Sequence, residues 1–457
     1  MLVVTLNFFK GYRDKGVIAF VALLTALPQV NVEYASPVNF GVYEYSRALS
    51  VTLLLPYYLT GEKEKVTFQE KVLIVFLACL ILFDFRADGF SVTVGLRLFL
   101  GYFLDWYLPF SVLSRTLRSK EQIRAVLGAI VLGSLIRLLP TLYEFVRQWN
   151  LYNLMFVMVG ENQELLFRRY RAGFIRVSSA FFSPIVHGYY GGLALIASIY
   201  LSRFIDTKYR IPYFATASIS VVIAFSKGPW LATAVAFCYL FFSDKKFARG
   251  KTISAILLVT VALAMTPVGE KIYGMIPFVG DISQESEDYR ELLLQQSLIV
   301  FKESPWFGLP SKELYAHPAL QVLLQGQGII DITNYYLQLL LEFGVFVLAV
   351  FLLMTISAVS GVRKVIKQFD RIFVYYDDIG SDLDKAKADA ISLGHNIIAL
   401  LMLSSIVLLI ISDIDRMLII HFVIVSIAVS YARTYGRVYK EIVNQKIERG
   451  VPQTIET

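Results

Sequence analysis

Long apolar runs alternate with short polar segments along most of this chain. Most runs are close to the 20 or so residues that a helix needs to cross about 30 Å of hydrocarbon. Backbone polar groups in lipid must be satisfied within their own segment, so each run is predicted to be a helix. The twelve predicted spans are 16–33, 39–58, 69–85, 91–112, 123–145, 184–202, 211–226, 229–242, 252–268, 330–357, 394–412 and 417–432. The run 229–242 is short, and the alternative is a re-entrant hairpin formed with 211–226.

The composition agrees with this pattern. Hydrophobic residues make up 56% of the 457 residues and charged residues 17%, with a mean hydropathy of +0.60, whereas soluble domains carry about 25% charged residues. These values exclude a soluble enzyme, a disordered scaffold and a disulfide-stapled secreted domain. The sequence therefore predicts an all-α integral membrane protein with about twelve transmembrane helices. We expect the first helix to act as its own insertion signal, because no small-residue cleavage site follows it.

The 43 basic and 36 acidic residues leave a net charge of +7. The basic residues recur in every second loop and at both ends, and the loops between hold almost none. Because basic loops stay in the cytoplasm, this alternation predicts that both termini are cytoplasmic. It also explains the positive charge without nucleic-acid binding. The basic stretches are 10–15, 63–71, 115–120, 203–210, 245–251, 363–367 and 433–440.

Two outward segments depart from this alternation. Segment 146–183 carries five arginines, namely Arg147, Arg168, Arg169, Arg171 and Arg176. Segment 267–329 is the largest outward loop, and we expect it to contain a helix over Tyr289–Ser304 that lies across the membrane face. Loops of this length are usually functional or disordered, and its apolar residues argue against disorder.

These features predict four regions. Residues 1–266 hold nine spans and the arginine-rich outer loop, and 267–329 form a large periplasmic loop. Residues 330–433 hold three spans and a cytoplasmic helical hairpin at 358–393, which we interpret as solvated rather than catalytic. Residues 434–457 form a cytoplasmic tail.

The outward arginines are the first candidate chemistry. Guanidinium groups stay charged and bind phosphate through two parallel hydrogen bonds, so a cluster at the outer boundary suggests a phosphate or diphosphate lipid headgroup. The alternative is an anchor that snorkels to ordinary anionic lipid. A further cation, Lys227, lies in the turn Ser226–Trp230, where helix amides can help to bind an anion. Taken alone, that turn is better explained by a snorkelling lysine with Trp230 at the membrane interface.

Polar residues also begin the span 330–357. Asn334, Gln338 and Glu342 are spaced by four residues and share one helix face, with Asp331 just before them. Ionisable groups within a membrane are costly, about 2.5–3.5 kcal/mol at the helix centre on insertion scales, and usually mark function. The alternative is a polar stripe that holds helices together.

In this order, the motifs resemble those of the O-antigen ligase and polymerase superfamily, the Wzy/WaaL-type bacterial integral membrane glycosyltransferases. The resemblance covers roughly residues 95–350. The matching elements are Asp105–Pro109, Arg171, Arg176, Ser226–Gly228, Arg290, Pro305–Gly308 and Asn334–Gly344. Two positions depart from the family pattern: Lys227 replaces the arginine of the turn, and Thr333 replaces the histidine before Asn334. Without that histidine, a polymerase is favoured over a ligase.

The resemblance implies a GT-C-like helical bundle in the bacterial inner membrane, with its active site on the periplasmic face. It implies a polymerase that transfers O-antigen or exopolysaccharide glycan from undecaprenyl diphosphate to a lipid-linked repeat unit. The diphosphate-binding candidates are Arg171, Arg176, Lys227 and Arg290, and Asn334, Gln338 and Glu342 are candidates for binding substrate. Arg290 is also a catalytic candidate, and the acceptor hydroxyl would be deprotonated by Asp331 or His317.

No cofactor is expected, and no metal, because no Asp-x-Asp motif lies on the outer side. The expected partners are an undecaprenyl-diphosphate-linked oligosaccharide, membrane lipid and a chain-length regulator, and not nucleic acid. Two alternatives stay open. One is a ligase that transfers glycan to lipid A core or protein, and the other is a flippase or transporter of lipid-linked oligosaccharide, which the intramembrane Arg97 and Arg137 favour.

Overall fold

The computed structural model describes residues 14–28, 31–32, 43–61, 65–87, 90–153, 170–171, 173–181, 183–243, 284–325, 328–372, 381–412 and 417–448. Within these ranges the protein is almost entirely helical. The strands are two antiparallel pairs of two residues each, β1 (Asn31–Val32) with β2 (Tyr43–Glu44), and β3 (Tyr170–Arg171) with β4 (Phe174–Ile175).

In the first half of the chain, side-chain caps begin α5, α6 and α8. Ser119 begins α8 with a capping box, in which its side chain accepts from the Gln122 amide. Pro56 and Pro109 each follow a π-helical turn, where a missing backbone donor widens the helix. The helices are α2 (Lys15–Ala26), α3 (Tyr45–Leu49), η1 (Ser50–Leu54), α4 (Leu55–Thr60), α5 (Phe68–Asp84), α6 (Val92–Tyr102), η2 (Phe103–Tyr107), α7 (Leu108–Thr116) and α8 (Lys120–Arg147).

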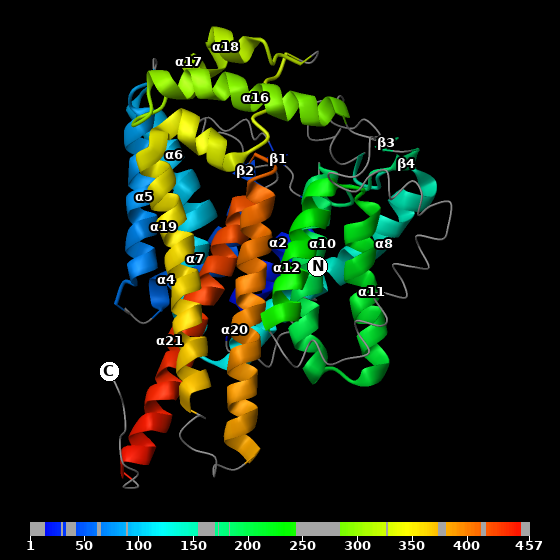
Figure 1. Cartoon of the computed structure of the whole chain (residues 1–457), viewed down its shortest axis with the longest axis vertical. Coiled ribbons are helices and arrows are strands. Elements are labelled where there is room, and N and C mark those ends of the chain that lie inside the picture. Colours follow the sequence, from blue (N-terminus) through cyan, green and yellow to red (C-terminus); the bar gives the residue numbers. More distant parts are fainter. Residues whose placement is uncertain are drawn as a thin grey trace.

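The second half contains the longest helices. These are α10 (Pro184–Leu201), η4 (Ser202–Phe204), α11 (Thr207–Ile223), α12 (Lys227–Ser243), α16 (Gln284–Glu303), α17 (Ser311–Ala316), α18 (Pro318–Gln321), α19 (Tyr335–Ile372), α20 (Ser381–Leu408) and α21 (Met417–Glu448). Figure 1 shows α19, α20 and α21 running side by side, with α10, α11 and α12 as a neighbouring group.

Five helices among the described residues are long and apolar enough to cross a membrane, which supports the predicted all-α membrane protein. They are Lys120–Arg147, Pro184–Phe204, Tyr335–Arg371, Asp384–Leu408 and Met417–Asn444, and Lys15–Ala26 is a shorter apolar helix. The described parts of 69–85, 91–112, 211–226 and 229–242 are mostly helical, and the last two form separate helices. The predicted spans 16–33 and 39–58 are helical only in part, because β1 lies in the first and β2 in the second, and these two strands pair with each other. The predicted span 252–268 lies outside the described residues, so the count of twelve stays a prediction.

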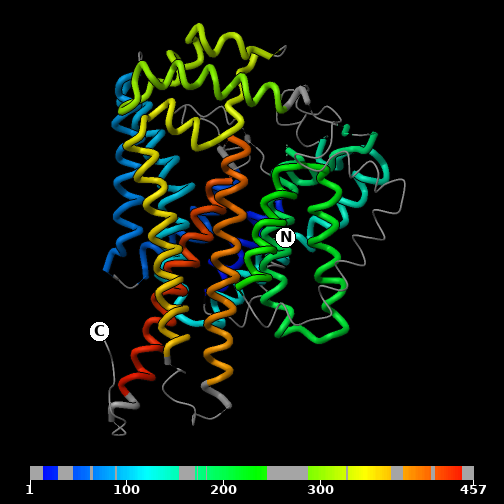
Figure 2. The backbone as a smooth tube through the Cα atoms, in the orientation of Figure 1, coloured from blue at the N-terminus to red at the C-terminus, as the bar shows by residue number. Residues whose placement is uncertain are grey.

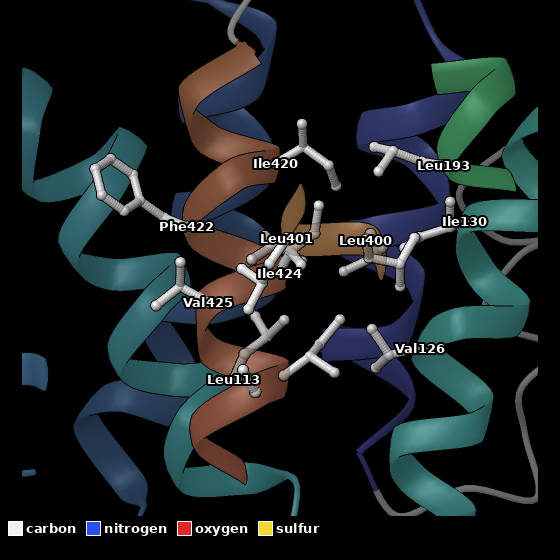
Figure 3. Packing of buried hydrophobic residues seen from close by; sticks show 14 of the residues in the cluster. Leu113, Val126, Ile130, Leu193, Leu400, Leu401, Ile420, Phe422, Ile424 and Val425 are labelled. Atoms are coloured by element: carbon white, nitrogen blue, oxygen red, sulfur yellow. The ribbon is translucent and has the colours of Figure 1, made fainter. Parts of the chain in front are cut away.

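The core lies where α2, α7, α8, α10, α20 and α21 meet. Figure 3 shows Leu113, Ile130, Leu193, Leu400 and Ile424 converging from five of these helices. In the most apolar stretch of α21, 89% of the residues are buried. The outer faces of α5, α6 and α11, in contrast, expose large apolar side chains. Since lipid is as apolar as these side chains, an exposed apolar rim around a buried centre suits a membrane bundle.

Helices α16, α17 and α18 lie across one end of the bundle and are called the cap below (Figures 1 and 2). Helix α16 begins five residues before the predicted helix 289–304 and ends one residue before its predicted end. The α10–α11 connection and the ends of α19 and α21 lie at the opposite end. The basic stretches 203–210, 363–367 and 433–440 therefore share one end of the bundle, as their alternation in the sequence predicts.

Candidate functional site

The cap is joined to α19 through two glycines with positive φ. Gly308 follows α16 with a φ of 64°, and Gly344 interrupts α19 with a φ of 78°. A Cβ on Gly344 would lie 2.2 Å from the Trp306 carbonyl oxygen, and one on Gly308 would lie 2.5 Å from the Leu341 carbonyl oxygen. Only glycine permits two backbones to approach this closely.

Backbone hydrogen bonds complete this joint. The Leu309 amide donates to the Leu341 carbonyl over 2.8 Å. The Val345 amide donates to the Pro305 carbonyl over 2.9 Å. The backbone N–H and C=O groups that the kink in α19 leaves without helical partners thus bond to the segment after α16. Buried backbone groups need such partners.

Arg86, just after α5, holds both sides of the joint. Its Nη1 donates to the Gly308 carbonyl and its Nη2 to the Glu342 carbonyl, each over 3.1 Å. The guanidinium also lies over the Phe83 ring, 4.7 Å from the centroid. Arg86 is not among the motif residues, and its one signal in the sequence is a cation directly after the outer end of the predicted span 69–85. The segments Pro305–Gly308 and Glu342–Gly344 therefore build the framework of the site.

The strand pair β3–β4 places Arg171 against the turn before α12. Arg171 Nη1 donates to the Phe225 carbonyl over 3.3 Å. Phe225 has a φ of 42°, which is unusual for a bulky residue, and its ring stacks on Phe174 with centroids 5.0 Å apart. The β3–β4 hairpin thus packs against the strained backbone at Phe225. The Phe225 carbonyl then faces Arg171.

Lys227 begins α12 two residues later and connects the turn to the cap. Its Nζ lies 2.9 Å from Glu287 Oε1 of α16. The Lys227 side chain is 15% exposed and that of Glu287 is 55% exposed. An ion pair with one exposed partner contributes little to stability, about 0–1 kcal/mol, so its effect is mainly to position α16 beside α12.

Arg290 lies on α16, three residues after Glu287. Its Nη2 is 3.4 Å from the Ile410 carbonyl, which follows α20. The residue as a whole is exposed, but partial burial lowers its pKa, while Asp331 and Glu287 act to raise it. Burial also lowers the pKa of Arg171, and the charge of Arg290 lowers it further. The two arginines are therefore close enough to repel each other.

Asp331 lies on the cap side of this group. The Tyr289 hydroxyl donates to the Asp331 carbonyl over 2.9 Å and accepts from the Asp331 amide over 3.1 Å. Ser412 Oγ is 3.5 Å from Asp331 Oδ1. Tyr289 precedes Arg290 on α16, so one helix positions both the cation and the carboxylate.

The polar residues of the first turns of α19 have local partners. Asn334 Oδ1 accepts from the Leu337 amide over 3.1 Å and caps the helix. Gln338 Nε2 donates to Glu342 Oε1 over 3.2 Å, and Glu342 is 9% exposed. These contacts agree with a polar stripe that holds the helix end, and a role for the three residues in substrate binding stays a prediction.

His317 lies apart from the arginines. Its Nε2 is 3.1 Å from Glu303 Oε2, and its Nδ1 accepts from the Ala319 amide at the start of α18. Glu303 is 13 residues beyond Arg290 on α16, which is about 20 Å along the helix. Because both ring nitrogens already have protein partners, His317 serves the cap in this structure.

Arg176 is half-buried next to Val177, whose amide donates to the Ile223 carbonyl over 3.2 Å at the end of α11. The structure thus places Arg176 beside the same hairpin as Arg171. Arg168 and Arg169 lie outside the described residues. Among the described residues, no group of three or more His, Cys, Asp or Glu side chains is arranged to hold a metal ion, and the metal-independence of the reaction stays a prediction.

The geometry thus brings Arg171, Lys227, Arg290 and Asp331 together from four separate segments. Residues 212–352 match the family model described as O-antigen ligase. This match supports the O-antigen ligase and polymerase superfamily resemblance over α11, α12, the cap and the first half of α19. No curated protein and no solved structure matches the chain.

Proposed function

We propose that this protein is a bacterial polysaccharide polymerase. It transfers glycan from undecaprenyl diphosphate to a lipid-linked repeat unit, using the site formed by Arg171, Lys227, Arg290 and Asp331. The observation that carries the proposal is the convergence of three cations from β3, α12 and α16 at one end of the bundle. Glu287 and Asp331 offset part of this positive charge, and a bound anion would offset more of it.

The leaving diphosphate is such an anion. As the bond between the anomeric carbon and the diphosphate oxygen breaks, its electron pair stays on the diphosphate. Arg171, Lys227 and Arg290 stabilise this charge as preorganised donors, which are typically worth about 3–4 kcal/mol each when removed. Of the three cations, Arg171 and Arg290 should stabilise the diphosphate most, because one guanidinium group can bind two phosphate oxygens at once.

Asp331 is the proposed general base. The acceptor hydroxyl oxygen bonds to the anomeric carbon, and its proton passes to the Asp331 carboxylate. The Tyr289 hydroxyl holds the backbone of Asp331 beside Arg290, which supports this assignment. His317 is left out of the mechanism, because its partner Glu303 lies about 20 Å from Arg290 along α16.

The proposal places the cap and the site on the periplasmic face of the inner membrane, with both termini in the cytoplasm. The basic stretches gathered at the opposite end of the bundle support this orientation. We further propose that the reaction is of the GT-C type, needs no metal and acts on O-antigen or exopolysaccharide units. A chain-length regulator is the proposed partner, and the chain is divided into the four regions predicted from the sequence.

A ligase is the second candidate, because the matching family model is described as O-antigen ligase. Arg137 supports a flippase only weakly: it is fully buried, but its Nη1 is 2.9 Å from His187 Nδ1 between α8 and α10. Arg97 lies on the exposed face of α6.

Purified protein reconstituted with lipid-linked repeat units distinguishes these functions. A ladder of longer lipid-linked glycans, absent with Arg290→Ala, supports the polymerase. Transfer only after addition of lipid A core or protein acceptor identifies a ligase. Movement of the lipid across the bilayer without any transfer identifies a flippase.

A further inference from the structure

A groove lies between α19 and α21 at the end of the bundle opposite the cap. It has a volume of about 870 Å³ and is lined mainly by α19, with Tyr439 of α21 on the other side. Figure 1 shows the two helices side by side in this region. Phe369 packs against the Tyr435 and Tyr439 rings, with centroids 6.0 and 6.1 Å apart, and so holds the two helices together.

The groove changes from apolar to basic along its length. Its upper part is lined by Ile356, which is 61% exposed, and Val359, together with the small hydroxyl side chains of Thr355 and Ser360. Its lower part is lined by four cations, namely Arg363, Lys364, Lys367 and Arg371. Arg363, Lys367 and Arg371 are four residues apart and therefore share one helix face.

The change occurs at the depth expected of a membrane boundary. Gly344 marks the kink under the cap, and Arg363 lies 19 residues further along α19, which is about 29 Å along the axis. The hydrocarbon core is about 30 Å thick. If the kink lies at one boundary, Ile356 and Val359 lie within the hydrocarbon and the cations lie at the other headgroup level.

The four cations have no carboxylate partner among the described residues. The nearby Asp370 is 4.0 Å from Lys387 of α20 instead. Within the described part of the chain these four cations repel one another with no carboxylate between them, so a bound anion is favourable. Each Lys or Arg near an anionic membrane surface is worth about a fivefold gain in affinity.

We propose that this groove is a binding site for an anionic phospholipid, with the headgroup phosphate between the cations and an acyl chain against Ile356 and Val359. The apolar upper half decides between a lipid and a soluble phosphate, because a free anion gains nothing from exposed aliphatic side chains. The proposal is independent of glycan transfer at the cap.

The test uses the full-length protein in mixed vesicles of phosphatidylcholine and phosphatidylglycerol, followed by native mass spectrometry of the lipids that stay bound. The groove variant is Arg363→Gln/Lys367→Gln/Arg371→Gln. The matched control is Lys208→Gln/Arg437→Gln/Lys440→Gln, which removes three exposed cations from the same end outside the groove. All six side chains are exposed, so neither set should impair folding.

The groove variant should lose the preference for phosphatidylglycerol over phosphatidylcholine by about a hundredfold, from three contributions of about fivefold each. The control should keep it. Equal losses in the two sets, or no loss in the groove variant, would overturn the proposal, because the lipid would then be held by general surface charge or elsewhere.

Val359→Trp separates the lipid from a soluble anion. This change fills the apolar half and leaves every cation in place, so it should release the bound phosphatidylglycerol. If the variant retains phosphatidylglycerol, or if inorganic phosphate displaces the lipid from the wild-type protein, the groove is a site for a free anion and the proposal is wrong.

Discussion

Replacing Gly344 by alanine tests whether the joint between the cap and α19 positions the active site. A Cβ at this position would lie 2.2 Å from the Trp306 carbonyl oxygen and 2.3 Å from the Trp306 carbonyl carbon. Both are backbone atoms and cannot move aside alone. The residue also has φ 78° and ψ −179°, a region that is essentially restricted to glycine and costs other residues about 1–3 kcal/mol.

The clash should separate the cap from α19. The Leu309–Leu341 and Val345–Pro305 hydrogen bonds would then be lost, at about 1 kcal/mol each. Together with the backbone strain, the expected destabilisation is about 3–5 kcal/mol. Because α16 carries Arg290 and Tyr289, displacement of the cap also moves the cation and the carboxylate away from Arg171.

The assay measures glycan elongation by reconstituted protein and, in parallel, thermal unfolding in detergent. Gly344→Ala should insert into the membrane, unfold at a lower temperature and form no ladder. Gly436→Ala in α21 is the matched control, since its added Cβ would meet nothing within 4 Å, and alanine favours a helix by about 1 kcal/mol over glycine. Wild-type elongation and unfolding temperature in Gly344→Ala would refute the joint as the device that positions the site.

The remaining predictions concern the site itself. Arg290→Ala should reduce elongation by about a hundred- to a thousandfold while the protein still inserts and unfolds normally, since one preorganised donor is removed; a wild-type rate would remove Arg290 from the site. Lys227→Arg should keep activity because the charge remains, and complete loss would mean that the turn near Glu287 has no room for a guanidinium. Asp331→Asn should abolish elongation without changing binding of the lipid-linked donor, as measured by co-purification; unchanged elongation would exclude it as the base. Chelation with EDTA should leave the ladder unchanged, and recovery of activity only on adding a divalent cation would contradict the metal-independent mechanism.

Local patterns in the chain were sufficient for most of the described helices and for naming candidate site residues. The apolar run 123–145 predicts α8, and Ser119 with Gln122 begins it by a capping box, because both signals depend on neighbouring residues alone. Arg171, Lys227 and Arg290 stand out for the same reason: each is a cation in an outward segment, where the charge alternation predicts few.

Only the tertiary structure decided what several motif residues do. The Pro305–Gly308 and Glu342–Gly344 segments pack against each other and against Arg86. The contacting residues are far apart in the chain. The sequence of either segment alone therefore predicts neither the close backbone approach nor the hydrogen bonds from Arg86.

His317 and Asp331 show the same limit. Both are outward polar residues in one loop and looked equivalent as bases. His317 contacts Glu303, which lies about 20 Å from Arg290 along α16. Tyr289, by contrast, directly precedes Arg290, and its hydroxyl is hydrogen-bonded to the Asp331 backbone. Hydropathy and capping are local properties of the chain, but which charges meet depends on how α12, α16 and the end of α20 pack against one another.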